Sequence, residues 1–200
     1  MTNGKTSRSK SLALVGIMGA LGNVLALISI TIAQLPSPIA GQVAVDLSNL
    51  AIVVVAVYAG WRLGWLTGLI AGFMPGIMYG FVTGTLGFLG PFGLMLGKSF
   101  TGLTVGALAR ATRLQQKKRA YLLVIPIVLV GYVPEFMFTV FFFLIMVPFF
   151  IAGAAFWVPL LVASIAVKAW VEMILISLLM AAFVRNSGFN KFIRGYLGRE

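Results

Sequence analysis

The chain has 200 residues, of which 60% are hydrophobic and 10% are charged, and its formal net charge is +11. Soluble domains have about 25% charged residues, so no soluble core could bury this much apolar surface. The absence of cysteine and histidine excludes disulfides, thiolate nucleophiles and Cys/His zinc sites. The acidic residues are only Asp46, Glu135, Glu172 and Glu200. So few carboxylates give poor support for metal or acid–base catalysis, and we expect no enzyme, no metal and no cofactor.

Apolar runs of about twenty residues follow one another along the chain, which is the length an α-helix needs to cross about 30 Å of hydrocarbon. The first run is too long for a signal-peptide core, so we expect an uncleaved first span. The sequence therefore predicts an all-α integral membrane protein with six transmembrane helices in one domain, residues 1–200. The expected helices are residues 11–33, 43–60, 63–82, 92–108, 121–147 and 157–184.

The basic residues indicate the orientation of these helices. Thirteen of the fifteen Lys and Arg residues fall in alternate connections, and the three connections between these carry none. Cytoplasmic loops collect Lys and Arg, so this distribution predicts that both termini are cytoplasmic. It also accounts for the net charge, so we expect membrane lipid as a partner and no nucleic acid. The basic segments are the amino terminus 1–10, Arg62, the loop 110–119 and the tail 185–200.

Two rows of small residues predict close helix packing. In the first row, glycine recurs at every fourth position from Gly60 to Gly84, which makes one smooth helix face. Such faces let helix backbones approach closely in lipid, and we expect this row to pack within the chain rather than against a partner. The second row includes Gly16 and Ala20 in the first helix. For this row, contact with another protein is an equal alternative.

Ionisable side chains within the predicted helices are costly in lipid and mark a partner or a cavity. Lys98, Glu135 and Lys168 all fall in the middle or outer part of their helices. Glu172 follows Lys168 by four positions, so these two side chains are expected either to neutralise one another or to line a ligand-binding cavity. Lys98 has no acid at this spacing. It is predicted either to bind an anionic or strongly polar group of a substrate or to form a bridge to Glu135.

Other polar and aromatic residues are candidates for a ligand site. Asp46 lies at the outer start of the second predicted helix, where capping the helix is its favoured role. Asn49, Tyr132 and Trp170 are able to supply hydrogen bonds or a stacking surface for a ring-bearing ligand.

The residues resemble a known family. Six helices in about 200 residues, a small-residue face early in the first helix, and an external loop that runs into DLSNLAIVVVAVYAGWRLGWLTGLIAG resemble the substrate-binding S components of energy-coupling factor (ECF) transporters. The later segment GPFGLMLGKSFTGLTVGALAR is similar to the fourth helix of that family. The resemblance covers nearly the whole chain.

The resemblance implies a multi-pass protein of the prokaryotic plasma membrane that captures a small water-soluble vitamin or precursor from outside. It further implies a transmembrane coupling subunit and two cytoplasmic ATPase subunits as partners. In the family, an A-x-x-x-A face on the first helix meets the coupling subunit. Here the nearest match is Gly16-x-x-x-Ala20, with Ala13 before it, so the spacing is kept while glycine replaces the first alanine.

The family binds its substrate toward the outer face, beneath the first loop and between the later helices. That implicates the loop 34–42 and the fourth, fifth and sixth predicted helices. The alternative is a stand-alone secondary transporter or channel for a small polar solute. Internal inverted repeats would favour it, and we see none in the sequence.

Overall fold

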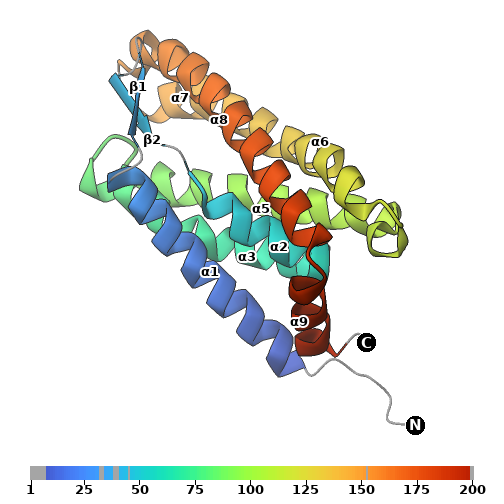
Figure 1. Cartoon of the computed structure of the whole chain (residues 1–200). Coiled ribbons are helices and arrows are strands. Elements are labelled where there is room, and N and C mark those ends of the chain that lie inside the picture. The colour runs from blue at the N-terminus through green and yellow to red at the C-terminus, as the bar shows by residue number, and fades with distance from the viewer. Residues whose placement is uncertain (1–7, 32–33, 38–40, 45, 152, 199–200) are drawn as a thin grey trace.

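A computed structural model describes residues 8–31, 34–37, 41–44, 46–151 and 153–198 of the chain (Figure 1). These residues are helical except for connecting turns and one antiparallel hairpin, in which Gln34 lies opposite Ala44. The elements are α1 (Arg8–Thr31), β1 (Gln34–Ser37), β2 (Gly41–Ala44), α2 (Ser48–Ala59), α3 (Trp61–Ala71), α4 (Phe73–Ile77), the π-helix η1 (Met78–Val82), α5 (Leu89–Ala111), the 3₁₀ turn η2 (Leu114–Gln116), α6 (Ala120–Phe141), the π-helix η3 (Phe142–Met146), α7 (Val147–Phe150), α8 (Ala154–Arg185) and α9 (Ser187–Leu197).

Within the described residues, five helical stretches are long and apolar enough to cross a membrane. They are α1, the stretch Trp61–Val82 that joins α3, α4 and η1, α5, the stretch Ala120–Phe150 that joins α6, η3 and α7, and α8. Their ends lie within a few residues of five of the predicted helices. The prediction of a helical membrane protein is confirmed.

The second predicted helix, residues 43–60, is shorter in the structure than expected. Part of this segment belongs to β2, and α2 has only 12 residues, which extend over about 18 Å. Eleven of these residues are buried, because α2 lies among α1, α3, α5 and α8 (Figure 1). Its continuous apolar sequence therefore reflects burial in protein on all sides. A sixth full-length span is not confirmed.

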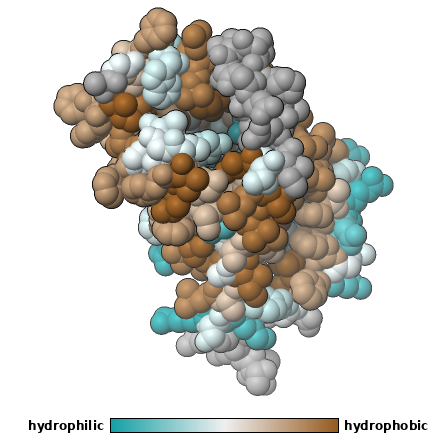
Figure 2. Space-filling model, turned by 90° about the vertical axis from the view of Figure 1, so that its left-hand side faces the viewer, coloured by the Kyte–Doolittle hydropathy of each residue, from teal (hydrophilic) through white to brown (hydrophobic). Residues whose placement is uncertain are grey.

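The outer surface of the bundle is apolar. Figure 2 shows a broad hydrophobic face with hydrophilic residues gathered at its margins. Large side chains such as Phe88, Phe149 and Phe156 are more than 80% exposed. A surface of this kind would promote aggregation in water but is the expected contact with lipid.

The glycine row packs within the chain, as predicted. At Gly68, an added Cβ atom would lie 2.6 Å from the Lys98 carbonyl oxygen and 2.6 Å from the Ser99 Cα atom on α5. Gly72 lies equally close to the α5 backbone, and Gly64 faces Gly102 there. Two helix backbones in direct contact require glycine at the crossing positions. This contact holds the third predicted helix against the fourth.

The tail contains a helix that was predicted only as a basic segment. Asn186 caps α9 by accepting a hydrogen bond from the Phe189 N–H at 3.0 Å. Ile193 and Leu197 are buried against the bundle. The Tyr58 hydroxyl donates to Asn190 Oδ1 at 2.6 Å and ties α9 to the end of α2.

Candidate functional site

Two ion pairs and the backbone of the segment before α2 form one largely buried network. Lys98 Nζ on α5 lies 2.6 Å from Asp46 Oδ2, and Lys168 Nζ on α8 lies 3.3 Å from Glu172 Oε1. The backbone N–H of Asp46 donates to Glu172 Oε1, which joins the two pairs. We call these four side chains the charge network. It connects α5 and α8 at the amino-terminal end of α2.

Asp46 has two tasks in this network. Its Oδ1 atom accepts a hydrogen bond from the Ser48 N–H at 2.8 Å in the first turn of α2, which agrees with the predicted capping role. Its other oxygen meets Lys98, which also donates to the Ser48 hydroxyl. Burial raises the pKa of the Asp46 carboxyl, but the charges of Lys98 and Lys168, together with the hydrogen bonds from Lys98 and Ser48, outweigh burial and hold that pKa below its ordinary value.

A bridge to Glu135, one of the two alternatives for Lys98, is not among the ion pairs of the described residues. The carboxylate paired with Lys98 is Asp46, because the segment before α2 folds against α5 and brings Asp46 within reach. The Lys168–Glu172 contact, in contrast, is confirmed, since four positions on one helix fix it locally.

Glu135 is buried beside the charge network, with 8% of its surface exposed. It accepts a hydrogen bond from the Thr101 hydroxyl on α5. Among the described residues it belongs to neither ion pair. The sequence analysis did not select Thr101, although its position three residues after Lys98 places both on one face of α5.

The three remaining predicted site residues lie on α2, α6 and α8. Tyr132 on α6 meets Trp170 on α8 edge to face, with ring centroids 5.8 Å apart. Phe136 packs against both rings and was not predicted. Asn49 is 5% exposed; its Nδ2 atom contacts the Met173 sulfur at 3.9 Å, and its Oδ1 atom is buried without a hydrogen-bond partner. These residues offer an aromatic surface and an unused acceptor.

The predicted docking residues lie on the outside of the bundle. Ala13, Gly16 and Ala20 are exposed on α1, and a Cβ atom added at Gly16 would have no neighbour within 4 Å in the part of the chain that the structure describes. The opposite face of the same helix is buried, because Gly19 and Gly22 pack against Ile70 and Ala71. α1 therefore has one face occupied within the chain and another that is free for lipid or a partner.

Long apolar helices with ionisable side chains buried among them define a multi-pass helical membrane protein. The family model for the substrate-specific component of ECF transporters matches residues 10–184. The chain belongs to this family, which is a family of transporter subunits in the prokaryotic cell membrane and not of enzymes. No curated protein and no solved structure matches the chain.

Proposed function

We propose that the chain captures a small water-soluble vitamin or precursor outside the cell and releases it inward together with a transmembrane coupling subunit and two cytoplasmic ATPase subunits. The family supports an ECF-type transporter subunit. The main observation in support of a substrate site at this place is the charge network, with Glu135 beside it. Burying Lys98, Glu135 and Glu172, and partly burying Asp46 and Lys168, costs free energy that a purely structural core would avoid, which favours a polar ligand nearby.

The proposed substrate contacts lie on α2, α5, α6 and α8. The Asn49 Oδ1 atom and Glu135 have acceptor capacity for a donor group of the substrate. Trp170 and Tyr132 supply a stacking surface for a ring. In our proposal, an anionic or strongly polar substrate group takes the place of Asp46 at Lys98. The full set is Lys98, Glu135, Lys168, Glu172, Asn49, Tyr132 and Trp170.

Mass spectrometry of the ligand released from gently purified protein tests the proposal directly and would identify the substrate. With that ligand, Lys98→Met is expected to weaken binding at least about tenfold, because a charge-assisted contact is lost. Asp46→Asn is the matched control, since it breaks the same ion pair from the other side. Equal affinity loss in both variants, together with an equal loss of thermal stability, would restrict Lys98 to a structural role.

We also propose six crossings with both termini in the cytoplasm, with α2 as a short crossing within the bundle. The gathering of Arg8, Arg62 and Arg110 at one cavity supports this arrangement. Single cysteines at the exposed positions Thr85 and Ala155 should react with an impermeant thiol reagent from outside. Cysteines at Lys118 and Ser187 should react only after lysis, and the reverse pattern would contradict the orientation.

The exposed face of α1 is the proposed contact for the coupling subunit. Ala13, Gly16 and Ala20 form a smooth patch there, and large apolar side chains flank it. Leu12 is 57% exposed and Ile17 is 62% exposed. Small residues between exposed apolar ones allow a partner helix to approach closely in lipid.

A further inference from the structure

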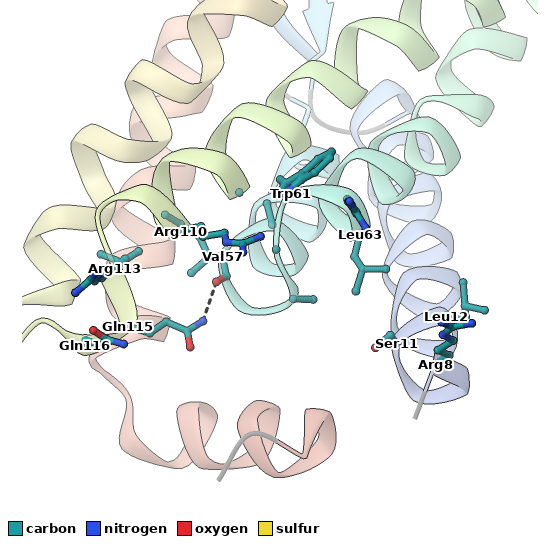
Figure 3. Close-up of a pocket in the computed structure, with 17 residues that line it drawn as sticks. Arg8, Ser11, Leu12, Val57, Trp61, Leu63, Arg110, Arg113, Gln115 and Gln116 are labelled. Atoms are coloured by element: carbon teal, nitrogen blue, oxygen red, sulfur yellow. Dashed lines mark hydrogen bonds between the residues drawn. The ribbon is translucent and has the colours of Figure 1, made fainter. Parts of the chain in front are cut away.

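A basic groove lies at the carboxyl end of α2, at the opposite end of that helix from the charge network. It is a cavity of about 1100 Å³ between the start of α1, the turn from α2 to α3, and the end of α5 (Figure 3). Four arginines line it, and they come from three different segments of the chain. They are Arg8, Arg62, Arg110 and Arg113.

No carboxylate among the described residues balances these arginines. Both ion pairs in the described part of the chain involve lysine, and their carboxylates belong to the charge network. The Arg62 guanidinium lies over the Trp61 ring, 5.0 Å from its centroid, which orients the side chain without neutralising it. The groove therefore concentrates uncompensated positive charge.

The backbone around the groove adds to this positive electrostatic potential. α3 begins at Trp61 directly after Gly60, and no side chain caps it. The first N–H groups of a helix lack intrahelical partners and carry a partial positive charge, which favours an anion. The uncapped end of α3 and the arginines thus favour the same kind of ligand.

The loop after α5 is held in a fixed conformation. Arg113 has φ 49° and ψ 43°, and it is the one non-glycine residue with positive φ among those the structure describes. This left-handed conformation costs about 1 kcal/mol or more and persists only where surrounding contacts impose it. Gln115 provides such a contact by donating to the Val57 carbonyl at 2.8 Å, and Arg194 donates to the Gln115 carbonyl at 3.2 Å.

We propose that the basic groove binds the phosphate headgroup of an anionic phospholipid. The lining includes apolar side chains from α1 and α3, among them Leu12 and Leu63. Figure 3 shows Arg8 and Leu12 on one side of the groove and Arg110 on the other. Leu12 is exposed at this edge of the groove. A basic pocket beside an apolar helix face fits a phosphate with attached acyl chains, whereas a soluble anion would use only the arginines.

The test titrates the purified full-length chain with phosphatidylglycerol or cardiolipin and counts bound lipid by native mass spectrometry. Phosphatidylcholine serves as the zwitterionic comparison. The double variant Arg62→Gln/Arg110→Gln is expected to lose at least about tenfold in affinity for the anionic lipids. Arg119→Gln/Lys191→Gln removes the same charge from exposed residues outside the groove and should stay within about twofold of the original chain.

Three results would overturn the proposal. One is an equal loss of affinity for the anionic lipids in both double variants, which would indicate that the lipids bind to the general positive charge of the surface. Another is that inorganic phosphate protects the chain against thermal unfolding as strongly as phosphatidylglycerol does, which would indicate a site for soluble anions. The third is unchanged lipid retention in Arg62→Gln/Arg110→Gln while the complex with the coupling subunit is lost, which would assign the groove to a protein partner. The proposal does not depend on the identity of the transported substrate.

Discussion

Two rows of small residues with the same four-residue spacing have opposite surroundings in this protein. The α3 row, which continues through α4 and η1, lies against the α5 backbone from Gly64 to Gly80. The α1 row, Gly16 and Ala20 with Ala13 before it, has no such neighbour. Spacing alone therefore specifies a smooth helix face but not what covers it.

The difference arises from the facing element. α5 carries its own small residues, so that Gly102 meets Gly64 and Gly90 meets Gly80. Among the described residues, no atom comes within 4 Å of a Cβ atom added at Gly16. Small residues on facing helices favour close backbone contact in lipid, and the α3 row meets such residues on α5. The following substitutions test the contrast, from the largest expected loss of stability to none.

Gly68→Ala should have the largest effect. The new methyl group would overlap the backbone at Lys98 and Ser99, and a backbone cannot move aside as a side chain can. We expect a loss of about 3 kcal/mol in the free energy of unfolding, at the upper end for overpacking. Thermal unfolding in detergent measures it, with Gly16→Ala as the control. Equal midpoints for the two variants would show that α3 and α5 are not in backbone contact.

Gly60→Ala tests the end of the α3 row, where glycine serves a different purpose. No atom lies within 4 Å of an added Cβ, but φ is 102° and ψ is 173°, a conformation essentially restricted to glycine. The expected loss is about 2 kcal/mol from backbone strain. Gly60→Asn should be no less destabilising, whereas a stability equal to that of the original chain would contradict the turn geometry between α2 and α3.

Gly22→Ala probes the buried face of α1. The added methyl would lie 2.7 Å from the Ala71 methyl, and its next neighbours are 3.6 Å away, whereas a methyl at Gly68 would lie within 3 Å of three backbone atoms. We therefore expect a smaller loss of about 1 kcal/mol. Combining it with Ala71→Gly should recover part of the loss, because the second change removes the obstructing atom. Purely additive losses would argue against this contact.

Gly16→Ala should not reduce stability and is expected to raise it by up to about 1 kcal/mol, because alanine restricts the unfolded chain more than glycine. It also creates the A-x-x-x-A spacing of the family, so co-purification with the coupling subunit should persist. Gly16→Leu should leave thermal stability within error but abolish that complex, since bulk blocks close approach. A complex that survives Gly16→Leu would remove this face from the proposed interface.

The charge network also contains one contact that the sequence predicts and one that it does not. The Lys168–Glu172 pair was predictable, because both residues lie one turn apart on one helix. The Lys98–Asp46 pair joins positions 52 residues apart, and the sequence instead suggested Glu135 as the partner. Which carboxylate reaches Lys98 depends on the path of the segment before α2, which local patterns do not encode.

The sequence by itself determined the membrane class, the approximate ends of the five long helices and the gathering of basic residues in alternate connections, because hydrophobic length and charge are local properties of the chain. Only the tertiary structure decided that α2 is a short helix buried among four others, that the α3 row is covered while the α1 row is open, and that four arginines share one groove. These features depend on which surfaces meet after the helices assemble, and residues distant along the chain become neighbours only then.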